Sequence, residues 1–105
     1  MGAKTTKAEI TVATRLVNSR EVPLTFYLEP WGEAYDMPPA AIFEVVARGP
    51  AGDGLEVAIA EEHITVWGWP GSVLRVFSNG TELGAGKWER SPVPPMPPVG
   101  SRVPL

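Results

Sequence analysis

The feature that most constrains the fold is a series of short segments in which apolar and polar residues alternate, each closed by Gly, Pro, Asn or Asp. A two-residue period is typical of a β-strand with one buried face, because successive side chains of a strand point to opposite sides of the sheet. The 11 glycines and 12 prolines are spread so evenly that few windows are long enough to form a helix. The pattern therefore predicts an all-β protein whose inward-facing residues include Phe43, Val45, Ala47 and Val57.

Seven segments carry the alternation, and the turns between them are short. They span residues 9–17, 22–28, 42–48, 55–60, 64–69, 73–78 and 81–85. Asn79-Gly80 is the strongest turn signal, because this pair suits a two-residue type I′ turn, and it places Phe77 opposite Glu82. Pro70-Gly71 fits the centre of a type II turn. Strands joined in this way predict a small antiparallel β-sandwich, or a flattened barrel, of about seven strands.

The chain divides into three regions. We expect a flexible N-terminus at residues 1–8, a β-sandwich domain at residues 9–89 and an extended Pro-rich C-terminal tail at residues 90–105. Inside the domain, residues 29–39 contain three prolines and no clear period, so we expect an ordered loop that leads from one sheet to the other. Several tail residues are more apolar than a solvated terminus requires, which predicts partial docking on the domain or on a neighbouring copy. These residues are Val93, Met96, Val99, Val103 and Leu105.

Composition argues against several classes of partner and site. The formal net charge is -3 and the nine Lys and Arg residues are scattered singly, whereas proteins that bind a phosphate backbone concentrate positive charge, so we expect no nucleic acid partner. The absence of cysteine removes disulfides and thiolate metal sites. The N-terminal residues lack the continuous apolar core of a signal peptide, and no window approaches about 20 apolar residues. We therefore expect no membrane partner and a cytoplasmic location.

The sequence contains few residues in arrangements that are typical of catalysis. His63 is the single histidine and follows two glutamates at the start of a predicted strand, where a partly exposed histidine without a catalytic role is the simpler interpretation. No serine lies in a Gly-x-Ser-x-Gly turn of the kind that presents a nucleophile. We expect no enzyme, no catalytic residue and no cofactor.

Three carboxylates lie close together in the predicted loop, at Glu29, Glu33 and Asp36. They are the candidate polar acceptors of the chain, and at this spacing they could converge on calcium or form the carboxylate pair of a glycoside hydrolase. No recognised calcium-loop pattern surrounds them, and acidic residues in a loop of an acidic protein are most often solvated. We assign no metal site to them.

Aromatic residues are the most suggestive candidates for a contact surface. The alternation assigns Tyr27 to a face away from the main core and places Trp67 and Trp69 together with Thr65 on such a face. Rings displayed together anchor protein partners or stack on sugars, while the competing interpretation is that they cap the open end of the core. The candidate residues for ligand or partner contact are Trp31, Tyr35, Trp67 and Trp69.

Two functions fit these observations. The first is a small non-enzymatic β-sandwich that acts as a protein-interaction or accessory module. Its partner is another protein or a second copy, and an exposed stripe of Thr65, Trp67 and Trp69 favours a homodimer. The alternative is a carbohydrate-binding module, with or without calcium, that uses the same rings as stacking platforms and the three carboxylates as hydrogen-bond acceptors. Enzymatic activity is the third and least favoured hypothesis, because a chain this small has few residues with which to form a concave pocket. The sequence identifies no small-molecule or glycan ligand.

Overall fold

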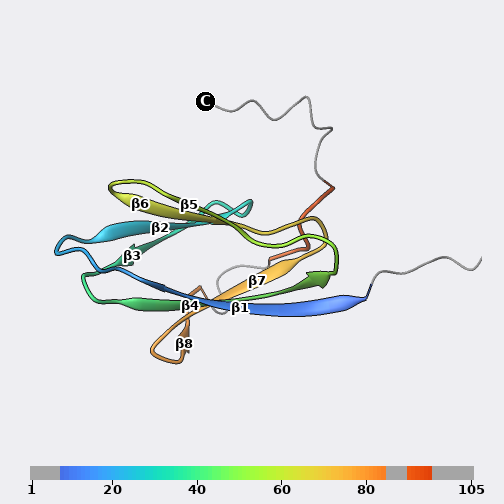
Figure 1. Cartoon of the computed structure of the whole chain (residues 1–105), viewed down its shortest axis with the longest axis horizontal. Coiled ribbons are helices and arrows are strands. Elements are labelled where there is room, and N and C mark those ends of the chain that lie inside the picture. Colours follow the sequence, from blue (N-terminus) through green and yellow to red (C-terminus); the bar gives the residue numbers. More distant parts are fainter. Residues whose placement is uncertain (1–7, 85–89, 96–105) are drawn as a thin grey trace, which may run out of the picture.

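The computed structural model describes residues 8–84 and 90–95, and these residues form eight strands in two stacked sheets (Figure 1). The strands are β1 (Glu9–Val17), β2 (Leu24–Glu29), β3 (Glu33–Met37), β4 (Ile42–Pro50), β5 (Glu56–Ile59), β6 (His63–Trp67), β7 (Val73–Ser78) and β8 (Thr81–Glu82). The described ranges contain no helix, and so none with the length and apolar character needed to cross a membrane. The predicted all-β class is confirmed.

Each sheet has four strands. Sheet A has the order β1-β4-β7-β8, and sheet B has the order β3-β2-β6-β5. Neighbouring strands run antiparallel except β2 and β6, which are parallel and bring Phe26 opposite Ile64. Parallel neighbours need a crossover connection, and here the chain between them passes through both sheets by way of β3, β4 and β5. The result is the small β-sandwich that the sequence predicts, with one parallel pair inside sheet B.

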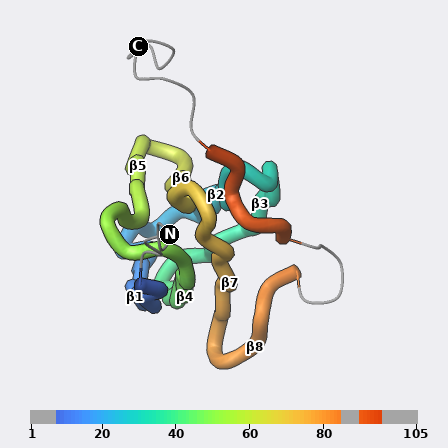
Figure 2. Tube along the Cα trace, turned by 90° about the vertical axis from the view of Figure 1, so that its right-hand side faces the viewer, coloured from blue at the N-terminus to red at the C-terminus, as the bar shows by residue number. Residues whose placement is uncertain are grey.

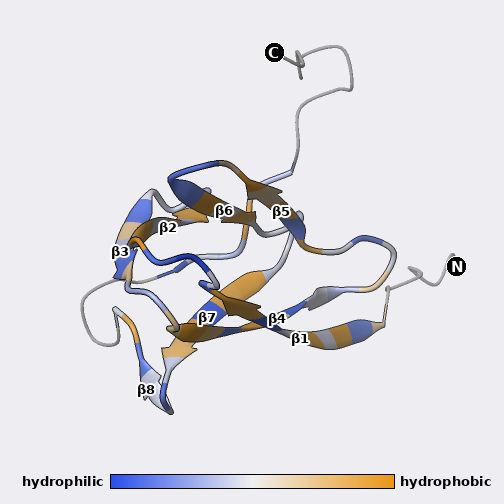
Figure 3. Cartoon of the chain, turned by 60° about the vertical axis from the view of Figure 1, so that its left-hand side comes forward, coloured by the Kyte–Doolittle hydropathy of each residue, from blue (hydrophilic) through white to orange (hydrophobic). Residues whose placement is uncertain are grey.

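Alternation along the strands builds the core between the sheets. Figure 3 shows the change between apolar and polar residues along β1, and in β4 Phe43, Val45 and Ala47 are buried as the sequence predicts. Phe26 of β2 meets Phe43 edge to face, with ring centroids 5.2 Å apart, and so joins the two sheets. The buried core consists of Leu24, Phe26, Leu28, Met37, Phe43, Val45, Ala47, Ile64, Val66, Trp69, Leu74 and Val76.

The hairpin of β7 and β8 confirms the predicted turn. Asn79 and Gly80 both have positive φ, at 50° and 78°, which a type I′ turn requires at its two central residues. Phe77 pairs with Glu82 in the predicted register, and the N–H of Leu83 donates to the carbonyl of Val76 at 2.8 Å. This turn therefore determines where β8 and the residues after it lie along sheet A.

Residues 29–39 differ from the predicted loop between sheets, because they contain β3. This strand pairs with β2 as a hairpin of sheet B, turned through residues 29–32 with a cis bond before Pro30 and a positive φ at Gly32. The inward side chains of β3 are Glu33, Tyr35 and Met37, and two of these are polar. A search for apolar alternation therefore overlooks the strand.

The segment after residue 54 is also more exposed than predicted. All four residues of β5 are exposed; Val57, expected in the core, is 39% exposed and Ile59 is 71% exposed. The strand lies at the edge of sheet B, where a residue can point toward the inner side of the sheet and still contact solvent. Alternation identifies a strand but does not show whether the opposite sheet extends far enough to cover it.

Trp69 lies in the core and not on the outer face that the sequence assigns to it. Strand β6 ends at Trp67, so the two-residue period does not continue to Trp69, which is only 3% exposed. Its indole Nε1 donates to the carbonyl of Pro50 at 2.7 Å, and its backbone N–H donates to Oγ of Ser72 at 2.9 Å. The interpretation that a tryptophan caps the core is correct for Trp69.

The described part of the C-terminal tail packs on the domain (Figure 2). Val93 is buried, its N–H donates to the carbonyl of Ser72 at 3.0 Å, and its own carbonyl accepts from the N–H of Gly71 at 2.8 Å. A Cβ added at Gly68 would lie 3.0 Å from Cγ2 of Val93, so the side chain of Val93 packs directly against the backbone of Gly68. The predicted docking is confirmed for Val93. The docking predicted for Met96, Val99, Val103 and Leu105 falls outside the described residues.

The two tryptophans at the end of β6 should differ in their contribution to stability. Trp69→Ala empties a buried site and leaves the carbonyl of Pro50 without its donor, so we expect a loss of about 3 to 5 kcal/mol in the free energy of unfolding. Trp67→Ala, the matched control, should cost far less because its ring lies on the outer face. Urea unfolding followed by circular dichroism measures both. Equal losses in the two variants would contradict the packing described here.

Candidate functional site

The outer face of sheet B brings three rings together. Tyr27 of β2 and Trp67 of β6 are 37% and 38% exposed, and His63 of β6 is exposed as well. The ring centroids of Tyr27 and His63 lie 5.6 Å apart, in edge contact. In the register of the sheet Tyr27 lies between Ala34 and Thr65, whose side chains are both smaller than its ring. We call Tyr27, His63 and Trp67 with these neighbours the aromatic face.

Carboxylates flank this surface. Trp67 pairs with Glu29 on β2 and with Glu56 on β5, so an acidic residue stands on each side of its ring. Asp36 of β3 lies opposite Thr25 on the same side of the sheet. None of the four strands of sheet B contains Lys or Arg. The surface therefore combines exposed rings with negative charge, a combination that attracts cationic groups both by ordinary charge and through the ring faces.

The four predicted contact residues do not meet on one surface. Trp67 lies on the aromatic face, and Trp69 lies in the core. Trp31 packs against the core from the turn between β2 and β3, and its Nε1 donates to the carbonyl of Ser91 at 2.9 Å. Tyr35 points inward from β3. Only Trp67 of the four therefore belongs to the aromatic face.

Sequence reasoning assigned Tyr27 to the correct side of its strand but did not connect it with Trp67, and it treated His63 as an ordinary residue. Their association depends on the parallel pairing of β2 with β6, which places Glu29 beside Trp67 and Thr25 beside His63. Strands 34 or more positions apart in the chain carry no local signal for that pairing. A signal does exist within each strand, because the rings of Tyr27 and Trp67 both occupy outward positions.

The predicted polar acceptors are separated in the same way. Asp36 points outward from β3, whereas Glu33, three pairs further along the hairpin, points inward and is 4% exposed. Glu29 lies on the outer face beside Trp67. Within the described ranges no three His, Asp or Glu side chains are grouped so that they could hold a metal ion.

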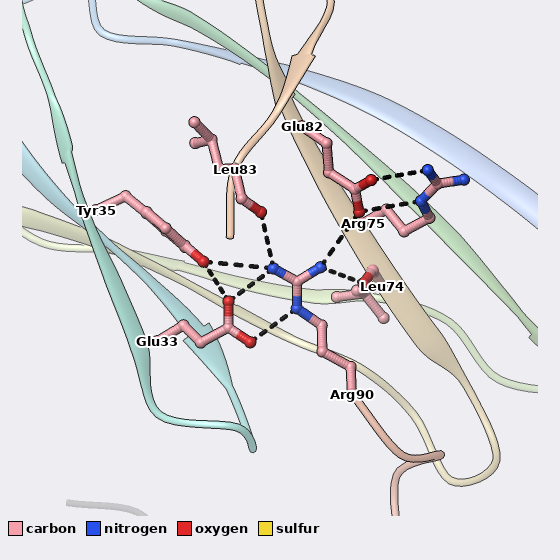
Figure 4. Close-up of polar contacts among 7 residues, drawn as sticks. All are labelled: Glu33, Tyr35, Leu74, Arg75, Glu82, Leu83 and Arg90. Carbon is pink, nitrogen blue, oxygen red and sulfur yellow. Dashed lines mark hydrogen bonds and ion pairs between the residues drawn. The ribbon is translucent and has the colours of Figure 1, made fainter. Parts of the chain in front are cut away.

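The strongest polar cluster of the described chain is buried between the sheets (Figure 4). Arg90 and Glu33 form a bidentate pair, with Nε to Oε2 at 2.7 Å and Nη2 to Oε1 at 2.6 Å. The hydroxyl of Tyr35 donates to Glu33 and accepts from Nη2 of Arg90 at 3.3 Å. The guanidinium also donates to the carbonyls of Leu74 and Leu83, at 3.2 and 3.0 Å.

This cluster is held in one charge state by its own contacts. Burial alone would raise the pKa of Glu33, but hydrogen bonds from Arg90 and Tyr35 and the positive charge of Arg90 outweigh it, so the pKa is lowered. Burial, followed by the hydrogen bond to Glu33, raises the pKa of Tyr35. Among the described residues no buried side-chain nitrogen or oxygen lacks a hydrogen-bond partner. The cluster therefore links β3 of sheet B to the β7–β8 hairpin of sheet A, and it presents no spare polar group to a ligand.

The outer face of sheet A offers two shallow hollows that share Val46. One, of about 470 Å³, lies over Ile42 and Phe77, and the other, of about 620 Å³, lies over Val73. Each arginine of this face is paired with a glutamate: Arg15–Glu44 at 3.5 Å, Arg48–Glu9 at 2.6 Å and Arg75–Glu82 at 2.8 Å. The charged side chains on the outer face of sheet A therefore largely neutralise one another. The aromatic face exposes the rings of Tyr27 and Trp67, and its strands carry acidic residues but no Lys or Arg, which makes it the better candidate.

Comparison of the whole chain with known proteins supplies no further guide. No protein-family model, curated protein or solved structure matches it. What the chain does has to be argued from its own surfaces.

Breaking the buried ion pair should destabilise the protein strongly. Arg90→Met leaves the carboxylate of Glu33 buried without its partner, which typically costs about 3 to 5 kcal/mol. The matched control is Arg48→Met, whose pair with Glu9 is exposed and should leave stability nearly unchanged. Urea unfolding at neutral pH compares the two variants. A small loss for Arg90→Met would show that the pair does not hold the sheets together.

The lowered pKa of Glu33 predicts acid sensitivity. Because the folded pKa lies below the ordinary value of 4.5, its stabilising effect is complete above about that pH and is lost as the pH falls through the lower folded value. Between pH 6 and pH 3 the wild type should therefore lose more stability than Glu33→Gln, whose amide does not titrate. The pKa of Glu82, lowered by its hydrogen bond from Arg75, contributes in both proteins. Parallel losses in the two proteins would contradict this role of Glu33.

Proposed function

We propose that this chain is a non-enzymatic interaction module that binds a protein partner through the aromatic face of sheet B. The observation that carries the proposal is the exposure of Tyr27 and Trp67 on one sheet face whose strands carry carboxylates and neither Lys nor Arg. Aromatic side chains contribute large contact area at low cost in conformational entropy, and they recur as anchors of protein interfaces.

The chemistry of the face selects the kind of partner. Proline-rich segments are already extended, and they dock on surfaces lined by aromatic rings with little further loss of entropy. A lysine or arginine in such a segment would lie near Glu29 or Asp36, or over the ring of Trp67. We therefore take the partner to be an extended, proline-containing segment of a protein that carries positive charge.

The size of the face favours a peptide over a globular surface. Four strands about 4.8 Å apart, with about 3.3 Å per residue along each, give a surface roughly 15 to 20 Å on a side. A stable complex of two folded proteins typically buries about 800 Å² on each partner, which is more than this face offers. We expect binding in the micromolar range. The burial of Trp69 shortens the apolar stripe that would have favoured a homodimer.

Binding can be tested by calorimetry with a synthetic peptide that repeats Pro-Pro-Arg, with a Pro-Pro-Glu repeat as the charge control. We expect the arginine peptide to bind and the glutamate peptide to fail. Trp67→Ala should weaken binding at least tenfold, whereas Ile42→Ala, an exposed apolar residue of sheet A, should not change it.

Two results would overturn the proposal. Binding that survives both Trp67→Ala and Tyr27→Ala would place the partner elsewhere on the molecule. Failure of the peptide combined with Trp67-dependent binding of an oligosaccharide from a glycan panel would show that the rings recognise sugar and not protein.

A further inference from the structure

The C-terminal tail leaves the domain at one end of the aromatic face. Val93 is fixed by its hydrogen bonds to Gly71 and Ser72, and it packs against Gly68, the residue that directly follows Trp67. Figures 1 and 2 both show residues 90–95 rising from beside sheet A to the level of sheet B. The chain therefore continues beyond Pro95 from a point close to the Trp67 end of the face.

The sequence beyond that point is rich in proline and carries positive charge, which is the composition proposed above for a partner of the aromatic face. Residues 96–105 contain Pro97, Pro98 and Pro104, one cation at Arg102 and no acidic residue. Ten residues in a polyproline conformation span about 31 Å, at about 3.1 Å per residue. That length exceeds the roughly 15 to 20 Å of the face, so the segment is long enough to cross it from the Trp67 end.

We propose that residues 96–105 of the same chain are an occupant of the aromatic face, which a protein partner of similar chemistry displaces. The inference rests on the proposed function, because it assigns a specific segment to the same surface. Charge complementarity supports it: Arg102 carries the only charged side chain of the segment, and the face carries Glu29 and Asp36.

Attachment makes even weak binding effective. A short linker holds a segment at a local concentration in the millimolar range, so a segment with a Kd of about 0.1 mM would occupy the face in about nine of ten molecules. A partner then finds about one tenth of the molecules free, and its apparent affinity falls about tenfold. The tail thereby raises the affinity that a partner needs in order to occupy the aromatic face.

The test compares the full chain with a chain that ends at Pro95, which keeps every contact described above. The probes are the Pro-Pro-Arg peptide and a synthetic peptide of residues 96–105. We expect the Pro-Pro-Arg peptide to bind the shortened chain about tenfold more tightly than the full chain, and the tail peptide to bind the shortened chain alone. In the full chain Arg102→Glu should reproduce part of this gain, and Ser101→Ala, the matched control, should not.

The possible failures are distinguishable. Equal affinity of the Pro-Pro-Arg peptide for both chains, with no binding of the tail peptide, overturns the inference and leaves the proposed function standing. No binding of the Pro-Pro-Arg peptide to either chain overturns the proposed function. A tenfold gain that disappears when the full chain is diluted would assign the face to the tail of a second copy, and so overturn occupation within one chain.

Discussion

The buried pair of Arg90 with Glu33 is the contact on which much of the arrangement depends. Glu33 belongs to the edge strand of sheet B, and Arg90 belongs to the segment that follows the β7–β8 hairpin of sheet A. Two charges removed from water are stable only when each satisfies the other, and here the guanidinium also meets two backbone carbonyls. The pair holds β3 against sheet A and fixes the start of the C-terminal segment.

That fixed start has consequences for the rest of the molecule. From Arg90 the chain passes Trp31, whose indole donates to Ser91, and reaches Val93, which completes the packing around Gly68 and Ser72. The same contacts bring the end of the described chain beside the aromatic face. The ion pair inside the sandwich and the proposed binding surface outside it are thus connected through six residues of backbone, 90–95.

The sequence predicted the features that depend only on residues close together in the chain. The strand at residues 9–17, the inward residues of β4 and the turn at Asn79-Gly80 follow from a two-residue period and from dihedral preferences, and each is confirmed. Strand β3 could not be predicted in this way, because two of its inward residues are polar, and the buried carboxylate of Glu33 is paired with Arg90. Its identity depends on a residue 57 positions away.

The same distinction explains the candidate site. The exposure of Tyr27 could be predicted from its own strand, but its place near Trp67 arises from the parallel pairing of β2 and β6. Trp69 was placed wrongly because nothing in the alternation marks the end of β6 at Trp67. Arg90 was assigned to the tail by composition, and its role inside the sandwich becomes visible only with the tertiary contacts.

The central claim is that the aromatic face of sheet B is the surface that meets a partner. Nuclear Overhauser contacts between the indole protons of Trp67 and the proline protons of a bound Pro-Pro-Arg peptide test it most directly. The account predicts such contacts to Trp67 and Tyr27, and none to Val46 or Phe77 on sheet A. Contacts confined to the hollows of sheet A would contradict it.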